Sequence, residues 1–138
     1  PENRLHSQLD NGKYSQKMKV KQREMLKINP LDAKQRNLKN RDIVEVFNDR
    51  GACLAGIKIS DEVMKGIVYL PVGAWYNPHK NENFCIHGNP NVLTDDIGCS
   101  SLSQGPSAHS TLVEIKKWKK DLPKISVFNL PVINKKIK

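Results

Sequence analysis

The residues best suited to chemistry lie in a polar segment, residues 87–94, which reads His-Gly-Asn-Pro-Asn-Val-Leu-Thr, and in the Ser103-Gln104 pair that follows it. Glycine and proline in such a stretch favour turns over core elements, so we predict a loop that presents fixed polar groups. Asn91 and Gln104 each carry a donor and an acceptor on one planar amide, and Ser103 adds a hydroxyl, a set that suits the edge of a heterocycle. The alternative is an ordinary turn-rich connection.

A second polar cluster, Arg4-Leu5-His6-Ser7-Gln8, lies near the start of the sequence. Arg4 is able to make two parallel hydrogen bonds to a phosphate or to a ring carbonyl, and the polar side chains that follow it supply further donors. The alternative for Arg4 or His6 taken alone is a solvated or satisfied surface side chain. The joint occurrence of the two clusters favours a binding site.

Further motifs lie between and after these clusters in the same chain. They are Ile28-Asn29-Pro30 with Asp32-Ala33, the run from Val44 to Gly51, Gly73-Ala74-Trp75-Tyr76, and Ala108-His109 followed by Leu112 to Ile115. With the two clusters, they resemble the C-terminal molybdopterin-dinucleotide-binding domain of the dimethyl sulfoxide / trimethylamine N-oxide / biotin sulfoxide reductase family, in family order and over nearly the whole chain. The pairing of Gly-Ala-Trp-Tyr with Gly-Asn-Pro-Asn-Val-Leu-Thr looks most like the trimethylamine N-oxide reductase branch.

This resemblance implies a mainly β domain, a double-psi β-barrel with one or more short helices, which spans residues 1–138 as the C-terminal part of a larger reductase. It implies that the parent binds bis(molybdopterin guanine dinucleotide) with its molybdenum. The residues that would contact this cofactor are Arg4, His6, Ser7, Gln8, Asn91, Ser103 and Gln104.

The resemblance also implies what the domain lacks. The molybdenum ligand of this family lies outside this segment, and nothing in the chain resembles a catalytic nucleophile or an acid–base pair. We therefore expect the cofactor to carry the chemistry, with the parent protein reducing an N-oxide or S-oxide by oxygen-atom transfer. The expected partners are the cofactor and the remaining domains of the parent, which we expect in the periplasm, with the cytoplasm as the alternative.

The net charge of +9 is unevenly spread along the chain. Residues 1–41 hold eleven Lys and Arg against four Asp and Glu, residues 116–138 hold eight against one, and residues 42–115 hold four against nine. Basic ends of this kind attract polyphosphates or nucleic acid. Because the lysines are dispersed among apolar residues and aromatic residues are few, we favour a solvated Lys-rich surface, part of which packs on the rest of a larger protein.

Two alternatives to cofactor binding stay open. One is a basic nucleic-acid-binding β-barrel, and the other is a structural scaffold with degenerate cofactor loops. Convergence of Arg4, His6, Asn91 and Gln104 on one concave face would favour the cofactor, and scatter would favour the scaffold.

The hydropathy and the cysteines argue against a membrane span, a disulfide framework and a standard zinc site. No run approaches the roughly 18 apolar residues that suggest a membrane span. Three cysteines without Cys-x-x-Cys spacing argue against a closed disulfide framework. His79, Cys85 and His87 suggest zinc, but their spacing fits no standard site. Cys99, where the resembled family usually has Thr, is expected to be a small, half-buried side chain.

Helix signals concentrate around residue 30. Asn29 is a good N-cap, Pro30 occupies the favoured first position and Asp32 lies in the first turn, so we predict a short helix over residues 30–36. Asn37 is then its left-handed C-terminal residue.

Most of the other predicted elements are strands, which indicates a small β-barrel. Arg41 stands in a tight turn where the resembled family has Gly, so either the turn differs or the residue is strained by about 1 kcal/mol or more. The apolar end of the chain, residues 119–138, is expected to pack on something. The predicted elements are a helix or irregular connection at 13–27, strands at 42–47, 53–59, 66–70 and 112–118, a hairpin turn at 48–51, a turn at 61–65 and a loop at 72–83.

Overall fold

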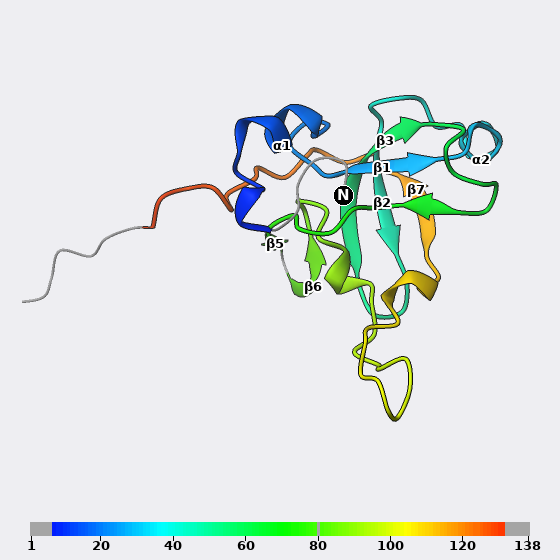
Figure 1. The fold of residues 1–138 in the computed structure, drawn as a ribbon. Helices are drawn as coiled ribbons and strands as arrows, with labels where there is room; N and C mark the ends of the chain where they lie inside the picture. Colours follow the sequence, from blue (N-terminus) through cyan, green and yellow to red (C-terminus); the bar gives the residue numbers. More distant parts are fainter. Residues whose placement is uncertain (1–6, 80, 132–138) are drawn as a thin grey trace, which may run out of the picture.

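The computed structural model describes residues 7–79 and 81–131. In this part of the chain the strands form one curled sheet, with short helices at its margins (Figure 1). The strands are β1 (Met25–Ile28), β2 (Ile43–Phe47), β3 (Ala52–Ile59), β4 (Val68–Tyr69), β5 (Pro78–His79), β6 (Asn81–Cys85) and β7 (Glu114–Lys117). The helices are α1 (Lys13–Met18) and α2 (Pro30–Gln35), with the 3-10 turns η1 (Ser7–Leu9), η2 (Pro90–Val92) and η3 (Ala108–Ser110). The predicted mainly β fold with short helices is confirmed.

Strand β3 is the centre of the sheet. It pairs antiparallel with β2 through the predicted hairpin, whose turn is closed by the Asn48 N–H donating to the Gly51 carbonyl at 3.0 Å. Its other edge is shared by two parallel strands, β1 along residues 56–59 and β6 along residues 52–53. Strands β4 and β7 add antiparallel to β1 and β2, which gives the order β4-β1-β3-β2-β7.

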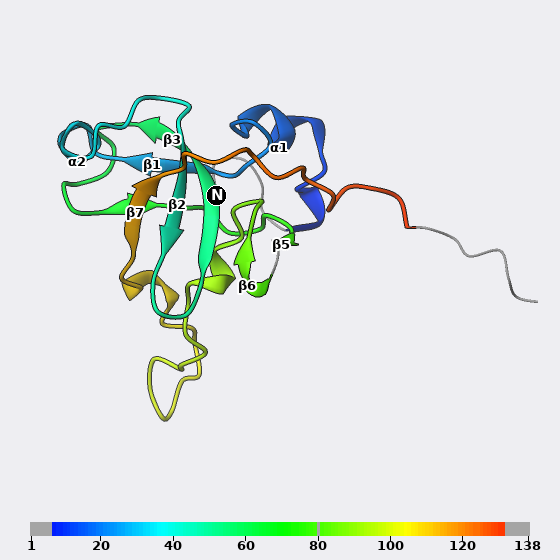
Figure 2. The ribbon, with the colours of Figure 1, turned by 180° about the vertical axis from the view of Figure 1, so that it is seen from behind.

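The two faces of the curled sheet bury two hydrophobic clusters. Alternate residues of β3 point to opposite faces, so Cys53, Ala55 and Ile57 join one cluster while Leu54 joins the other. The second cluster also contains Ile125, from the segment after β7. The prediction that this apolar segment packs is therefore confirmed for Leu122, Ile125, Val127 and Phe128, which pack on the barrel itself, whereas Leu130 is 90% exposed. Figure 2 shows the segment, in orange, crossing the sheet before it leaves the barrel.

The predicted helix near residue 30 is confirmed as α2. The Asn29 side chain accepts from the Leu31 N–H at 3.0 Å, which caps the helix as expected. Asn37 adopts the predicted left-handed conformation, with φ +51°. Arg41 has φ +68°, so the turn keeps the conformation that glycine would adopt more easily, at a cost of order 1 kcal/mol.

Three of the sequence-based element assignments were wrong. Residues 13–27 were predicted as a helix or irregular connection, but residues 25–27 lie in β1, a fully buried strand in which Lys27 reaches Glu62. The predicted strand at 66–70 is limited to β4, and the predicted loop at 72–83 contains β5 and most of β6. The missed strands β1 and β6 both pair in parallel with β3, a strand that is distant from them in the sequence. Their own local pattern was therefore weak.

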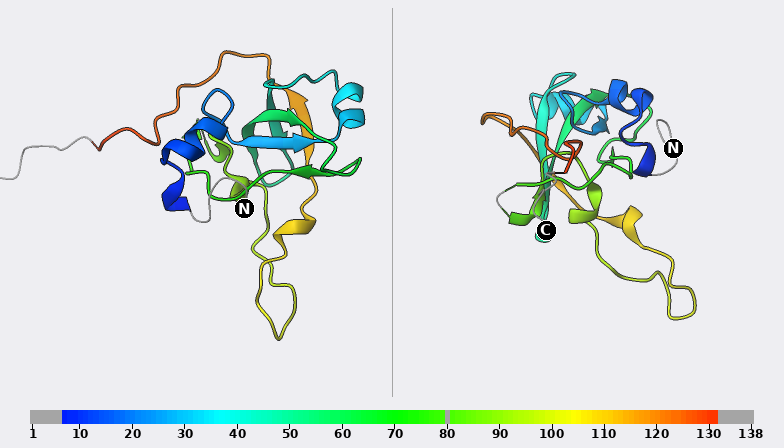
Figure 3. Two further views of the ribbon diagram at one scale, coloured as in Figure 1. Left: turned by 45° about the horizontal axis from the view of Figure 1, so that its top comes forward. Right: turned by 90° about the vertical axis from the view of Figure 1, so that its left-hand side faces the viewer.

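The margins of the sheet carry the segments of interest for function. Helices α1 and α2 lie at opposite ends of the barrel, and the segment between η2 and η3 projects from it as a long loop (Figure 3). Within the described residues, no helix has the length and apolarity needed to cross a membrane.

Candidate functional site

A cleft at the α1 end of the barrel brings the two predicted polar clusters together. Its volume is about 480 Å³. Ser7 comes from η1 and Asn91 from η2, two turns that are far apart in the sequence but border the same hollow. The residues that line it are Ser7, Val72, Gly73, Ala74, Trp75, Tyr76, Asn89 and Asn91.

Local capping holds Asn91 at the wall of the cleft. Asn89 precedes η2, and its side-chain oxygen accepts from the Asn91 N–H at 2.9 Å, while Pro90 occupies the first position of the turn. The amide nitrogen of Asn89 donates to the Ala74 carbonyl at 2.8 Å. Asn89 therefore ties this turn to the loop around Ala74, which forms another wall of the cleft. Asn91 itself stays exposed.

Trp75 connects the N-terminal turn to the segment that contains His87. Its indole N–H donates to the Ser7 carbonyl at 2.5 Å, and its backbone N–H donates to Oδ2 of Asp10 at 2.9 Å. Its carbonyl lies 2.8 Å from Nδ1 of His87. Because a carbonyl only accepts, Nδ1 of His87 carries the proton. Sequence reasoning quoted Trp75 in the Gly-Ala-Trp-Tyr motif but did not assign it to the site.

A buried cluster of charges lies behind the cleft. Lys19 Nζ is 2.7 Å from Oδ1 of Asp10 and 3.0 Å from Oε2 of Glu24, and the side chains of all three residues are at most 1% exposed. His87 is fully buried beside them, 3.7 Å from Asp10. Burial, and then the charge of Lys19, lower the pKa of His87, so its ring is neutral at pH 7.

This cluster corrects two expectations. Lys19 belongs to the lysines that sequence reasoning assigned to a solvated surface, but it is buried as the counter-ion of two carboxylates. His87 was predicted in a loop that presents polar groups, but it faces the interior, where its ring lies nearly perpendicular to that of Phe128, with the ring centroids 5.1 Å apart. A single lysine in a polar stretch carries no local sign of such burial.

The other predicted site residues lie elsewhere. Gln8 is exposed on η1 and does not line the cleft. Ser103 and Gln104 lie in the projecting loop, where the Gln104 amide donates to the carbonyls of Ser100 and Ser101 at 3.2 and 3.4 Å. The structure therefore does not bring these two residues to the cleft formed by Ser7 and Asn91. Arg4 and His6 lie outside the described residues.

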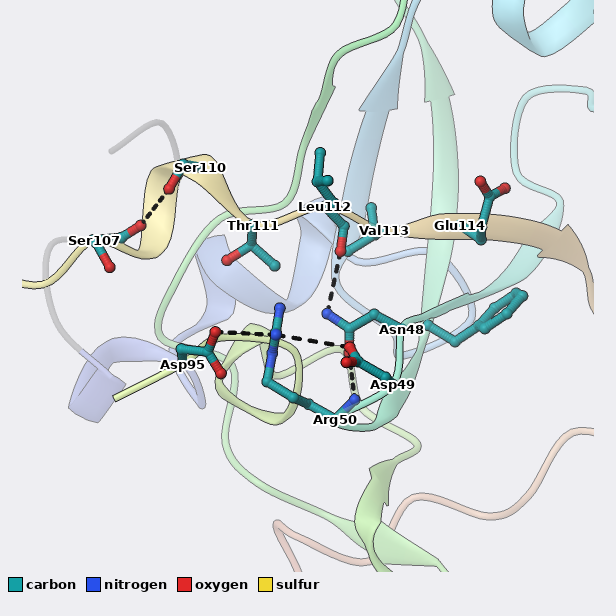
Figure 4. A pocket seen from close by; sticks show the side chains of 11 residues that line it. Asn48, Asp49, Arg50, Asp95, Ser107, Ser110, Thr111, Leu112, Val113 and Glu114 are labelled. Carbon is teal, nitrogen blue, oxygen red and sulfur yellow. Dashed lines mark hydrogen bonds and ion pairs between the residues drawn. The ribbon is translucent and has the colours of Figure 1, made fainter. Parts of the chain in front are cut away.

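The base of the projecting loop is held by the β2–β3 hairpin turn, beside a hollow of about 750 Å³ (Figure 4). Asn48 Nδ2 donates to the Leu93 carbonyl at 2.8 Å and to the Leu112 carbonyl at 3.2 Å, so one side chain bridges both stems of the loop. Arg50 adds a bond from Nε to the Leu93 carbonyl at 2.8 Å and an ion pair with Asp95 at 3.0 Å. Sequence reasoning predicted only a turn here.

The cysteines and the candidate zinc ligands show a different arrangement. Cys53 and Cys85 are buried in the sheet, and burial raises the pKa of the Cys53 thiol far above its ordinary value. Cys99 is exposed on the projecting loop, so the expectation of a half-buried side chain was wrong. Its thiol donates to the nearby Ser103 carbonyl at 3.4 Å. No group of three or more metal-ligating side chains is found among residues 7–79 and 81–131.

Comparison with known proteins agrees with these motifs. A family model described as Molydopterin dinucleotide binding domain matches residues 1–112. The chain is 47% identical over 136 residues to a trimethylamine-N-oxide reductase of Salmonella typhimurium (strain LT2), covering 96% of this chain and 16% of that protein. It is 48% identical over 122 residues to trimethylamine-N-oxide reductase 1 of Escherichia coli (strain K12), covering 86% of this chain and 14% of that protein. The Vibrio vulnificus (strain YJ016) trimethylamine-N-oxide reductase is 42% identical over 135 residues, which is 96% of this chain and 16% of that protein.

The chain belongs to the molydopterin dinucleotide binding domain family, as its motifs predicted. It spans only 16% of the length of the first of these relatives. The predicted molybdopterin cofactor is supported at the level of the family, and nothing in these comparisons supports the nucleic-acid-binding alternative.

Proposed function

We propose that this domain holds bis(molybdopterin guanine dinucleotide), with its molybdenum, as the C-terminal part of a reductase that acts on trimethylamine N-oxide or a related N-oxide or S-oxide. The observation that carries the proposal is the cleft in which Ser7 and Asn91, from the two family motifs, lie together. Family membership and the identity to trimethylamine-N-oxide reductases support it. Of the four residues whose convergence was to decide against a scaffold, Asn91 lines the cleft, Gln104 bonds within its own loop, and Arg4 and His6 lie outside the described residues.

The lining of the cleft fits such a ligand. A pterin presents ring donors and acceptors, and the hydroxyl of Ser7 and the amide of Asn91 are the neutral groups that pair with them. No acidic residue is among the described residues that line the cleft, which suits a ligand with anionic diphosphates. The aromatic residues Trp75 and Tyr76 also line the cleft. When bound, the cofactor supplies the redox chemistry that removes the oxygen atom from the substrate.

The remaining predicted residues have separate parts in this proposal. Arg4 and His6 precede Ser7 in the chain and would extend the contact toward the diphosphate. Ser103 and Gln104 would reach a different part of the cofactor, because their loop projects away from the barrel (Figure 1). Gln8 would act from the exposed side of η1. The other domains of the parent would complete the enclosure.

The finer fold assignment belongs to the same proposal. We propose that the curled sheet is a double-psi β-barrel. Two parallel pairings, of β1 and of β6 with the same edge of β3, support it, because a sheet made of hairpins alone has no parallel pairs. For the compartment we propose the periplasm, on the resemblance alone, with the cytoplasm as the alternative. Fractionation of cells that express the parent from its own gene tests this choice.

Cofactor retention in the parent tests the proposed function. Asn91→Ala removes a neutral hydrogen bond worth roughly 0.5–1.5 kcal/mol, so retention should weaken about two- to tenfold. Arg4→Ala removes a charged bond worth roughly 1.5–3 kcal/mol and should weaken retention about ten- to a hundredfold. The measurement is molybdenum content per protein, alongside turnover per bound molybdenum.

Lys116→Ala is the matched control. Lys116 is 59% exposed, pairs with Glu45 at 3.2 Å and does not line the cleft, so its loss should leave molybdenum content unchanged. If Arg4→Ala and Asn91→Ala both keep full molybdenum content while turnover falls, the anchoring role proposed for this domain is wrong.

A further inference from the structure

We propose that Asp10 is a positioning residue for the cofactor cleft: its buried carboxylate holds the Trp75 loop against the Ser7 turn and, through His87, against the Asn89–Asn91 turn. This inference rests on the proposed function of the cleft. Asp10 itself is fully buried and does not line the cleft, so its action on a ligand is indirect.

The first link joins the N-terminal turn to the Trp75 loop. Oδ2 of Asp10 accepts from the Trp75 N–H at 2.9 Å, and the Asp10 N–H donates to the Ser7 carbonyl at 2.9 Å. The same Ser7 carbonyl accepts from the Trp75 indole at 2.5 Å. These bonds form a closed ring of contacts among Ser7, Asp10 and Trp75, so a change at any one of them moves the wall on which Ser7 stands.

The second link reaches the turn that carries Asn91. His87 donates from Nδ1 to the Trp75 carbonyl at 2.8 Å, and the same nitrogen lies 3.7 Å from Oδ2 of Asp10. The negative charge of Asp10 favours a proton at this nitrogen, which keeps the ring in the tautomer that donates to Trp75. Two residues further along, Asn89 bonds to Ala74 at 2.8 Å. The two turns that present Ser7 and Asn91 are thus fixed to one loop.

The third interaction is the ion pair between Asp10 and its counter-ion, Lys19. Lys19 Nζ lies 2.7 Å from Oδ1 of Asp10, which leaves Oδ2 for the Trp75 N–H. Hydrogen bonds to an ionised acceptor are about twice as strong as those between neutral groups. An asparagine in place of Asp10 has the same shape but one oxygen instead of two. Its amide nitrogen would face either the ammonium of Lys19 or the N–H of Trp75, and both are donors.

The test compares Asp10→Asn with Glu24→Gln in the full parent enzyme loaded with its cofactor. Both variants remove one buried carboxylate beside Lys19, but Asp10 Oδ2 accepts from the Trp75 N–H at 2.9 Å, whereas Glu24 Oε1 accepts from the Met25 N–H at 3.3 Å. Val46→Ala leaves a cavity in the hydrophobic core beside β2, and it serves as the control for a loss of stability alone. Molybdenum content is followed over time at 25 °C after removal of free cofactor by gel filtration.

Hydrogen exchange, read by mass spectrometry on the same samples, supplies a readout that a general loss of stability would not produce. In Asp10→Asn we expect faster exchange in peptides over residues 7–12, 72–78 and 87–91, with β2 unchanged. We expect molybdenum to be lost about tenfold faster or more, as for the loss of one charged hydrogen bond. Glu24→Gln and Val46→Ala should lose molybdenum at a rate closer to that of the unchanged enzyme.

Each other outcome overturns a defined part of the reasoning. If Asn91→Ala loses cofactor and Asp10→Asn does not, the role of Asp10 is wrong and the proposed function stands. If neither does, the proposed function fails as well. Equal losses in Asp10→Asn, Glu24→Gln and Val46→Ala would mean that Asp10 contributes stability only. Should Asp10→Asn not fold, the combination D10N/K19M/E24Q removes the lysine together with the two carboxylates that it pairs with, and must show the same loss and the same exchange pattern.

Discussion

Replacing Lys19 with methionine should destabilise the chain strongly, because it removes a cation that two buried carboxylates share. Asp10 and Glu24 are both fully buried, and their oxygens lie 2.7 and 3.0 Å from the same ammonium nitrogen. These two oxygens are therefore less than about 6 Å apart, and at an effective dielectric constant of about 20 their repulsion is about 3 kcal/mol. Removal of one partner from a buried ion pair costs about 3–5 kcal/mol in general, which agrees with this value.

The assay is urea unfolding of the 138-residue chain at pH 7, with Lys17→Met as the control. Lys17 is an exposed lysine in α1, the helix that ends one residue before Lys19, so its replacement should change the free energy of unfolding by no more than about 0.5 kcal/mol. Lys19→Met should lower the free energy of unfolding by about 3–5 kcal/mol.

Removal of the two carboxylates separates charge from packing in this result. When Asp10→Asn and Glu24→Gln are already present, Lys19→Met no longer removes the cation of a charged pair, so it should lower the free energy of unfolding by much less than in the unchanged chain. A loss under about 1 kcal/mol for Lys19→Met alone, or an equal loss in both backgrounds, would refute the assignment of Lys19 as the counter-ion of this cluster.

Three further predictions concern the same part of the molecule and the cysteines. Burial lowers the pKa of His87 below its usual 6.5, so on acidification the unfolded chain takes up a proton that the folded chain excludes. As the pH is lowered past about 6.5, the free energy of unfolding should therefore decrease, by at most about 1.4 kcal/mol per pH unit. The His87→Gln variant should show a smaller slope in urea titrations. Cys99 is exposed whereas Cys53 and Cys85 are buried, so a thiol reagent should label one cysteine in the folded chain and three in denaturant, and rapid labelling of a second thiol would contradict the structure. Gly88→Ala should cost about 1–3 kcal/mol, since the backbone has φ +92° and a Cβ atom there would lie 2.5 Å from a neighbouring side chain; an unchanged urea midpoint would show that the loop is not packed as described.

The sequence alone was sufficient where a structure depends on neighbouring residues. Asn29, Pro30 and Asp32 predicted α2 because a helix cap is made within one turn of the chain. The turn at residues 48–51 predicted the β2–β3 hairpin for the same reason. The family motifs identified the domain, since they lie in a fixed order over most of the chain.

The tertiary structure decided what depends on partners far along the chain. Strand β1 has weak local periodicity, and its pairings with β3 and β4, both distant in the sequence, make it a strand inside the sheet. Trp75 became a contact of Ser7 and Asp10 only when the loop folded over the N-terminal turn. Gln104 turned its amide to its own loop, although its chemistry suited a ligand equally well.

The chemistry available at the cleft was therefore determined by the sequence, and its geometry by the fold. Residue types established that amides and hydroxyls such as Asn91 and Ser7 could meet a polar heterocycle. Which of them share one wall depends on bonds between residues 7–10, 72–76 and 87–91, and no local pattern specifies those pairings. The burial of Lys19 shows the same reason most directly, because a lysine is solvated or buried according to whether distant carboxylates fold around it.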